Sequence, residues 1–504
     1  MLIKPVIARS DMLSCALCMD APCSGACPKA DPAGALLGIW FDNQDVAALK
    51  IPAENVCAAC DAPCEAACVN SGSVPIKRLL SALYERVRPA AEIALPDTED
   101  RLKCELCGTP LENPFLLSSS VVASAYDMCA RAFEAGWAGA CLKTVSTLDI
   151  HEASPRFSAI KGNDGRIMGF KNIEQLSDHS VAENMEIYRR LKKNYPSKFI
   201  MASIMGQNEA EWESLAKLCE ENGADAVELN FSCPNMQEDG LGSDIGQVPE
   251  LVERYTKAAK RSVAIPVLAK LTPNVAAMGP AAEAALQGGA DGIAAINTIK
   301  SIVGVSPYTH ISAPAVKGKS AVGGYSGNAV KPVALRFIAE LGQNPALTGM
   351  HISGMGGIET WRDALEFILM GAGSVQVTTA VMQYGYRIID GLKEGLNYYL
   401  AQTGLSSVKE LVGAGLDAVS DTTDVLDRDT VLFPAFDTAK CNGCGRCIIS
   451  CNDGGHQAIG FVDRRPKLDG SKCVGCHLCR LVCPKGAITA GKKRIRRDRQ
   501  RNLP

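Results

Sequence analysis

The sequence has little of what marks a membrane-bound, secreted or nucleic-acid-binding protein. Aromatic residues make up 5% of its 504 residues and the formal net charge is −3, so neither base stacking nor attraction to phosphates is indicated. The first residues lack the apolar core of a signal peptide. The uncharged stretch 367–386 contains Gly, Gln and Thr, which favours a buried strand with loops over a membrane span. We therefore expect a cytoplasmic protein that binds neither nucleic acid nor a membrane.

A dinucleotide-binding fingerprint is also missing. No GxGxxG motif follows an expected strand, and the nearest glycine cluster is GMGGIE at 354–359. The chain is therefore expected to carry no NAD(P) or FAD domain of its own. Hydrophobic residues at 47% and charged residues at 21% are typical of a globular protein with several cores, about three domains by length.

Cysteine, in contrast, is abundant, with 22 residues. One group lies at 15–68 and another at 441–483. Without a signal peptide, such grouping favours metal or redox chemistry over disulfides. The pattern predicts an N-terminal cysteine domain at 1–95, a middle domain at 101–420, a C-terminal cysteine domain at 433–490 and a disordered basic tail at 491–504. Cys129, Cys141 and Cys219 are interpreted as structural. Cys104 and Cys107 form a further CxxC pair that is also interpreted as structural, with a metal or redox role as the alternative.

The middle domain alternates short apolar segments with amphipathic helical stretches, which is typical of the α/β class. Eight strands are expected, at 114–120, 139–145, 199–205, 226–232, 266–272, 292–298, 351–357 and 374–380. This count predicts a (β/α)8 TIM barrel rather than a doubly wound sheet. Nearly every strand ends in polar residues, which a barrel would gather at one mouth.

The C-terminal domain contains two CxxCxxCxxxC runs, the second followed by Pro484. This doubled spacing is the bacterial ferredoxin signature for two [4Fe–4S] clusters, in which the fourth cysteine of each run binds the other cluster. The predicted ligands are Cys441, Cys444, Cys447 and Cys483 for one cluster, and Cys451, Cys473, Cys476 and Cys479 for the other. Two zinc sites are the alternative, which the repeated runs disfavour.

The N-terminal cysteines have a different spacing. The stretches CMDAPCSGACP and CDAPCEAAC resemble the helical iron–sulfur domain of the glutamate synthase small subunit and of dihydropyrimidine dehydrogenase. The resemblance implies two [4Fe–4S] clusters with interleaved ligands, one held by Cys15, Cys18, Cys23 and Cys68, the other by Cys27, Cys60 and Cys64. Some relatives complete the second cluster with a Gln, but the matching stretch 76–87 has none, so Cys57 is the predicted fourth ligand. Zinc is again the alternative.

The middle domain carries a closer resemblance. The motifs LKT (142–144), ELNFSCPN (228–235), AKLTPN (269–274), INT (296–298) and GGYSGNAVKP (323–332) together resemble the dihydropyrimidine dehydrogenases, best their bacterial catalytic-subunit type. The resemblance implies FMN in the barrel, with its phosphate at glycine-rich turns after the last strands. The implied cofactor-binding residues are Ser119, Lys143, Thr144, Lys270, Gly327, Met355, Gly356, Gly357, Thr378 and Thr379.

The same resemblance implies a site for a pyrimidine base. Uracil presents alternating carbonyl and N–H groups, which carboxamides can pair with because they offer both donors and acceptors. The matching positions are Asn208, Asn230, Ser232, Asn297 and Thr298. Cys233 is the predicted acid: hydride from reduced FMN would reach C6 of uracil or thymine and the Cys233 thiol would give its proton to C5.

The electrons for this reduction, or from its reverse, would pass through the clusters. The implied partner is a separate flavoprotein subunit that oxidises NAD(P)H with FAD, or else a ferredoxin, and the implied assembly is a homodimer or a heterotetramer. Two alternatives remain. A dihydroorotate dehydrogenase shares the barrel, FMN and a similar cysteine motif, but needs an Asn for the orotate carboxylate where this chain has Arg166. A non-catalytic electron-transfer subunit is the other, which the intact Cys233 disfavours.

Overall fold

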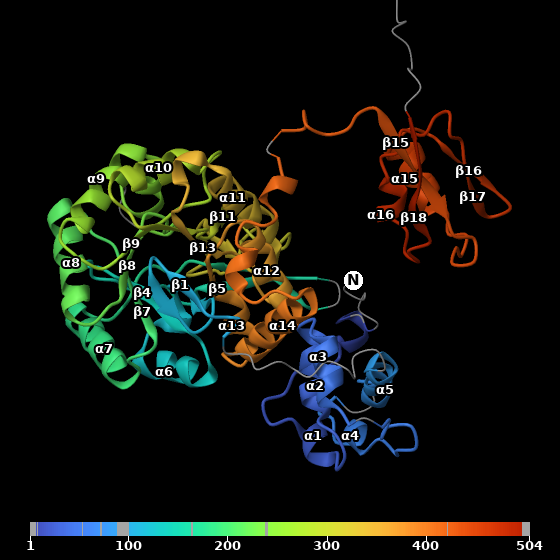
Figure 1. The fold of residues 1–504 in the computed structure, drawn as a ribbon, viewed down its shortest axis with the longest axis horizontal. Helices are drawn as coiled ribbons and strands as arrows, with labels where there is room; N and C mark the ends of the chain where they lie inside the picture. The colour runs from blue at the N-terminus through green and yellow to red at the C-terminus, as the bar shows by residue number, and fades with distance from the viewer. Residues whose placement is uncertain are drawn as a thin grey trace, which may run out of the picture. The chain divides into compact units, whose positions relative to one another are not determined.

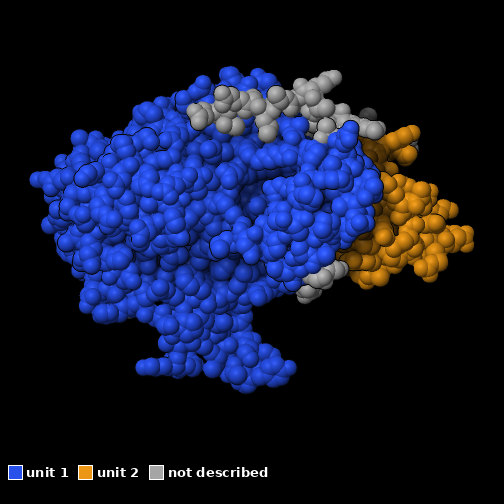
Figure 2. All heavy atoms as spheres, turned by 90° about the horizontal axis from the view of Figure 1, so that it is seen from below, with its two compact units in different colours: residues 1–419 blue, residues 420–504 orange. Residues whose placement is uncertain are grey.

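A computed structural model of the chain describes residues 7, 9–52, 54–70, 73–87, 100–162, 165–236, 240–420 and 422–495. The chain divides into two compact units, residues 1–419 and residues 420–504, which Figure 2 colours separately. Within the described ranges, no helix has the length and apolar character needed to cross a membrane.

The first unit contains a closed barrel of eight parallel strands, seen at the left of Figure 1. Neighbouring strands follow one another in chain order, with β14 closing onto β3. The predicted TIM barrel is thus confirmed, strand for strand. The strands are β3 (Phe115–Leu117), β4 (Gly139–Val145), β7 (Phe199–Ile204), β8 (Ala226–Asn230), β9 (Val267–Lys270), β10 (Gly292–Ala295), β13 (His351–Met355) and β14 (Ser374–Val377).

Helices surround the barrel, and two of them begin at capping boxes. Ser180 and Glu183 form a capping box before α7, and Thr360 and Asp363 form another before α12. Trp137 and Trp212 are among the largest fully buried side chains between helices and strands. The helices are α6 (Tyr126–Ala135), α7 (Val181–Asn194), α8 (Glu209–Glu221), α9 (Pro249–Lys260), α10 (Gly279–Gln287), α11 (Lys331–Gln343), α12 (Trp361–Leu369), α13 (Thr379–Tyr384) and α14 (Ile388–Thr403).

Two smaller sheets extend the barrel. The hairpin of β1 (Cys104–Leu106) and β2 (Thr109–Leu111) precedes the first barrel strand. Burial raises the pKa of both Cys104 and Cys107 to about 12, which favours their structural interpretation. A four-stranded sheet, in the order β11-β12-β6-β5, is built from insertions after β4 and β10. Its strands are β5 (Phe157–Lys161), β6 (Ile167–Asn172), β11 (Ile299–Ser301) and β12 (Gly323–Ser326).

The N-terminal helices belong to the same unit and pack against α12 to α14, where Figure 1 shows them in blue. Asn43 donates to the carbonyl of Gly391 at 2.5 Å. Arg387 donates to the carbonyl oxygens of Leu17 and Cys18 at 2.6 and 3.3 Å, so the barrel binds the loop between two predicted cluster ligands. The helices are η1 (Arg9–Met12), α1 (Pro22–Ala26), α2 (Pro32–Trp40), α3 (Gln44–Lys50), α4 (Pro63–Ala66) and α5 (Ile76–Val87).

The second unit pairs β15 (Thr430–Phe436) with β18 (Ile488–Ile495) and β16 (Ile459–Val462) with β17 (Arg465–Leu468), both antiparallel. Its helices are α15 (Arg446–Gly454) and α16 (Leu478–Leu481). The expectation of a disordered tail from residue 491 is wrong for 491–495, because this segment pairs with β15. The rest of that predicted tail lies outside the described residues.

The packing of the N-terminal helices on α14 is tight enough to test. A Cβ added at Gly395 would lie 2.2 Å from Asn43 Oδ1 and 2.2 Å from Trp361 Cδ1. At Gly391, one turn earlier, the nearest atom would be Asn43 Nδ2 at 3.2 Å. We expect Gly395→Ala to destabilise this contact by about 1–3 kcal/mol and to lower the thermal unfolding midpoint.

Gly391→Ala is the matched control, because both substitutions gain about 1 kcal/mol of helix propensity. The control should lower the midpoint less than Gly395→Ala, because only the terminal amide of Asn43 has to shift there. Equal midpoints for the two variants would contradict the packing described for Gly395.

Candidate active site and cluster-binding loops

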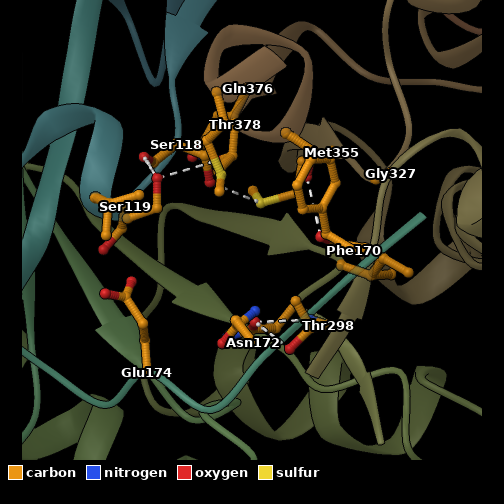
Figure 3. Close-up of a pocket in the computed structure, with 18 of the residues that line it drawn as sticks. Ser118, Ser119, Phe170, Asn172, Glu174, Thr298, Gly327, Met355, Gln376 and Thr378 are labelled. Atoms are coloured by element: carbon orange, nitrogen blue, oxygen red, sulfur yellow. Dashed lines mark hydrogen bonds between the residues drawn. The ribbon is translucent and has the colours of Figure 1, made fainter. Parts of the chain in front are cut away.

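The carboxyl ends of the barrel strands and the four-stranded sheet enclose one large pocket (Figure 3). It holds about 1140 Å³ of space not filled by protein atoms, part of it open to solvent. Ser118, Thr378 and Gln376 lie on one side in this view, and Asn172 and Thr298 on the other. Among its lining residues are the sequence-predicted Ser119, Lys143, Thr144, Asn230, Cys233, Lys270, Asn297, Thr298, Gly327, Met355, Gly356, Gly357, Thr378 and Thr379.

Asn230, the last residue of β8, organises one wall of this pocket. Its Nδ2 donates to Thr144 Oγ1 at 2.8 Å. Its Oδ1 accepts from the backbone N–H groups of Ser232 and Cys233 at 3.2 and 3.1 Å, and from Ser232 Oγ at 3.0 Å. One buried carboxamide therefore fixes the loop that carries Cys233 relative to β4.

The next part of the wall comes from the loop after β10. Asn297 Nδ2 donates to Ser232 Oγ at 2.8 Å, and its Oδ1 accepts from the backbone N–H of Thr298 at 2.7 Å. Ser232 is fully buried and does not line the pocket, although we predicted it as a substrate-binding residue. It acts instead as the link between Asn230 and Asn297.

Lys143, near the end of β4, is buried between carboxylates. Its Nζ lies 3.4 Å from Glu152 Oε1 and 3.8 Å from Glu174 Oε1, and Arg156 Nε lies 2.9 Å from the same Glu174 atom. Burial raises the pKa of Glu174, while Lys143 opposes that shift. The charge of Lys143 is thus balanced within the protein.

The charge of the other pocket lysine, Lys270, is also balanced by a carboxylate. Lys270, at the end of β9, lies 3.2 Å from Glu228 Oε1 and 3.4 Å from Ser118 Oγ, which accepts its hydrogen bond. Gln376 Nε2 donates to Glu228 Oε2 at 3.4 Å. Gln376 Oε1 is buried and has no hydrogen-bond partner among the described residues, so it is an acceptor available to a bound group.

Glycines form the floor where a phosphate was predicted. Gly356 and Gly357 have φ of +125° and +89°, and Gly327 has φ of +94°, a region that favours glycine. A Cβ at Gly357 would lie 2.9 Å from the carbonyl oxygen of Gly327, so only a bare backbone fits there. Thr379, the first residue of α13, borders this cradle and donates to Ser326 Oγ. The glycine cradle, Lys270 and the unpaired Oε1 of Gln376 fit FMN.

Cys233 lines the pocket with 6% of its surface exposed. Burial raises the pKa of its thiol to about 11, and the backbone N–H at Asn235 opposes the shift. At neutral pH the side chain is therefore a thiol that still holds its proton.

Asn208 is a predicted substrate-binding residue that the structure places outside the pocket. It does not line the pocket, and its Oδ1 instead accepts from the backbone N–H of Glu211 at 3.1 Å, so it caps α8. A polar residue after a strand serves equally well as the cap of the helix that follows, and the sequence does not separate the two roles. In its place the structure brings Asn172 into the pocket, from β6.

Several other lining residues were missed by sequence analysis; some lie at the ends of barrel strands, and others come from short inserted strands. Asn172 Nδ2 donates to the carbonyl of Gly324 at 3.3 Å and its Oδ1 accepts from Asn235 Nδ2 at 3.1 Å. The sequence signal was available in the polar pair of Asn172 and Glu174 directly after an alternating stretch. The missed residues include Ser118, Ser120, Phe170, Asn172, Glu174, Tyr325 and Gln376.

The N-terminal cysteines gather in the two predicted groups. Burial raises the pKa of Cys15, and the nearby thiols of Cys23, Cys18 and Cys68 raise it further. Burial likewise raises the pKa of Cys57, with Cys60 and Cys27 adding to the shift, and Cys64 lies near Cys27 and Cys57. Cys57 thus lies near Cys27, Cys60 and Cys64, and its role as the fourth ligand stays a prediction.

The C-terminal cysteines form two sets in the same way. Cys441, Cys444, Cys447 and Cys483 line one small cavity, and Cys451, Cys473, Cys476 and Cys479 line another. Backbone N–H groups of Gly475, Ala458 and Ala487 donate to three of these sulfurs, at 3.3 to 3.4 Å. Such bonds are a known means of tuning a cluster's potential.

Comparison with known proteins agrees with this architecture. Residues 101–400 match the dihydroorotate dehydrogenase family and residues 435–490 match the 4Fe-4S dicluster domain. The chain therefore belongs to the dihydroorotate dehydrogenase family, whose barrel is expected to bind FMN, and it carries a ferredoxin-like dicluster domain in addition.

Individual relatives are more specific. The chain is 51% identical over 363 residues to the NAD-dependent dihydropyrimidine dehydrogenase subunit PreA of Escherichia coli (strain K12), covering 72% of this chain and 88% of the relative. It is 36% identical over 345 residues to the chloroplastic dihydropyrimidine dehydrogenase (NADP(+)) of Arabidopsis thaliana, covering 66% and 81%. It is 38% identical over 317 residues to the dihydroorotate dehydrogenase B (NAD(+)) catalytic subunit of Pyrococcus furiosus, covering 62% and 98%.

The protonation state of Cys233 can be measured by alkylation. Because burial raises the pKa of this thiol to about 11, we expect its reaction with iodoacetamide to accelerate about tenfold per pH unit from about pH 8 to about pH 10. Peptide mass mapping gives the rate at this residue alone. A rate that levels off near pH 9, as for an ordinary thiol of pKa about 8.5, would contradict the assignment.

The role of Cys57 can be tested by iron content. We expect Cys57→Ala to lower the iron and sulfide bound per chain, because one N-terminal cluster loses a ligand. Cys219→Ala is the control, since Cys219 is fully buried in α8 outside both groups. Equal iron content in Cys57→Ala and wild type would show that Cys57 is no ligand.

Proposed function

We propose that this protein reduces the C5–C6 double bond of uracil or thymine to the 5,6-dihydropyrimidine, or catalyses the reverse reaction. The observation that carries the proposal is the pocket itself. A thiol that retains its proton, Cys233, faces the same space as a glycine cradle and a ring of amides. The identity to a dihydropyrimidine dehydrogenase subunit supports the substrate class.

FMN would be held at its phosphate and at its flavin ring. Gly327, Gly356 and Gly357 would offer backbone N–H groups to the phosphate, and Thr378 and Thr379 would offer hydroxyls. Lys270 would place its ammonium near the ring, with Ser119, Lys143, Thr144 and Met355 completing the pocket. When bound, FMN supplies a reversible hydride donor and acceptor.

The pyrimidine would be recognised by amides on one wall. Asn172, Asn230 and Asn297 each combine a donor and an acceptor, and Thr298 adds a hydroxyl. Ser232 would act indirectly by holding Asn297. Because much of this wall is buried, a molecule that left its amides unpaired would bind poorly.

Cys233 would hold the proton that C5 of the pyrimidine takes up. Reduction adds hydride to C6, which leaves enolate character between C5 and the C4 carbonyl, so C5 must then be protonated. Asn230 positions the Cys233 backbone for this step. In the reverse direction Cys233, as the thiolate, would accept the C5 proton.

The clusters would relay electrons to and from this site. The C-terminal dicluster domain and the two N-terminal cysteine sets would hold four [4Fe–4S] clusters, with residues 1–95 as the cluster-binding part of the first compact unit. The electrons would come from a flavoprotein subunit that oxidises NAD(P)H with FAD, since the E. coli relative is named as an NAD-dependent subunit. A ferredoxin is the alternative donor, and a homodimer or heterotetramer is the expected assembly.

Dihydroorotate oxidation is the second candidate, favoured by the family match and by the Pyrococcus relative. Orotate differs from uracil by a carboxylate, which needs positive charge in the site. Among the described residues that line the pocket, the lysines are Lys143 and Lys270, and both are paired with buried carboxylates. Glu174, a further carboxylate, also lines the pocket. The pocket therefore fits a neutral pyrimidine better.

This preference can be tested with the chemically reduced protein under anaerobic conditions. We expect uracil or thymine to reoxidise the bound flavin with formation of the 5,6-dihydropyrimidine, and orotate to leave it reduced. Reoxidation by orotate with formation of dihydroorotate, and none by uracil, would replace the proposal with dihydroorotate chemistry. Bound clusters without flavin, and no reaction with any of these, would indicate an electron-transfer subunit.

A further inference from the structure

The interior of the barrel contains a charged network directly below the proposed flavin site. Glu228 on β8 has no exposed surface, and the side chain of its partner Lys270 is 4% exposed. β8 and β9 are neighbours, and Asn230 pairs in register with Lys270, so Glu228 lies one side-chain layer deeper in the barrel. The lysine borders the pocket, whereas the carboxylate does not.

The carboxylate is held from the opposite side of the barrel. Gln376 on β14 reaches Glu228 Oε2, although β14 and β8 are separated by three strands in the barrel order. Gln376 Nε2 also donates to Ser353 Oγ at 3.1 Å, and Ser374 Oγ donates to the same oxygen at 3.0 Å. His351 Nε2 lies 2.9 Å from Ser374 Oγ. A continuous polar chain therefore leads from the start of β13 to Glu228.

A buried ion pair of this kind is expensive to keep for stability alone, because apolar side chains of similar volume pack as well without desolvation cost. Two thiols also lie near the pair: Cys141 on β4 contacts Glu228, and Cys233 lies within reach of the charge of Lys270. Neither thiol supplies a second charge at neutral pH. The pair is thus electrically neutral as a unit.

We propose that Glu228 is a positioning residue that sets the midpoint potential of the flavin by neutralising Lys270. This inference rests on the FMN proposed above. Reduction places negative charge on the flavin ring, so an unopposed ammonium beside it would stabilise the reduced form and raise the potential. With Glu228 in place, the ammonium of Lys270 stabilises the reduced flavin less. The flavin potential then stays lower, so electron transfer from the reduced flavin to the pyrimidine remains favourable.

The test is a redox titration of the flavin in the full chain, followed by its visible absorbance. Glu228→Gln keeps the shape of the side chain and removes its charge. We expect the equilibrium to shift at least tenfold toward reduced flavin, a rise of about 30 mV for a two-electron couple.

Two further variants make the result specific to charge. Lys270→Gln alone should lower the potential, and the double variant Glu228→Gln/Lys270→Gln should return it close to wild type, because the pair is again neutral. If Glu228→Gln alone fails to fold, the comparison of Lys270→Gln with the double variant still measures the same coupling.

Asp291→Asn is the matched control. Asp291 precedes β10 at the opposite end of the barrel and pairs with Lys260 at 2.7 Å, so its removal disturbs a barrel ion pair far from the pocket. The flavin potential of Asp291→Asn should equal that of wild type. Unchanged potentials in Glu228→Gln, or a double variant that does not return toward wild type, would overturn the role of Glu228. Absence of FMN from the wild-type protein would overturn the proposed function as well.

Discussion

The candidate site depends on the hydrogen bonds made by one buried carboxamide, that of Asn230. Its donor side holds Thr144 on β4, and its acceptor side holds the backbone of the loop that carries Cys233. Through Ser232 the same network extends to Asn297 after β10. Three strand ends that are distant in sequence are thereby fixed relative to one another, which is the precondition for placing a proton donor against a bound pyrimidine.

Charge balance is the second constraint. Lys143 and Lys270 bring two cations to a pocket with little exposure, and each is matched by carboxylates that are themselves buried. Buried charges are tolerated when they are paired and hydrogen-bonded. The consequence is a pocket with strong local dipoles and little net charge, suited to a neutral heterocycle.

The eight strands of the barrel were predictable because each is a short apolar run, buried along its whole length, that ends in polar residues. The two C-terminal cysteine sets were predictable because ligation of [4Fe–4S] clusters fixes cysteine spacing. Asn208 and Asn172 show what a local sequence pattern does not determine. A residue after a strand can cap the next helix, as Asn208 does, and a short inserted strand such as β6 carries too weak a pattern to place Asn172 in the pocket. The pairing of Glu228 with Gln376 depends on barrel closure, which no local pattern encodes.

The proposed reduction of the pyrimidine depends most directly on the proton held by Cys233. A single-turnover stopped-flow experiment would follow flavin reoxidation after mixing the reduced protein with uracil, for wild type and for Cys233→Ala. We predict that reoxidation slows by about 10²–10⁴-fold in the variant, the usual contribution of a positioned acid, while its affinity for uracil changes little. Reoxidation at the wild-type rate in Cys233→Ala would contradict the account, because C5 would then be protonated by another group.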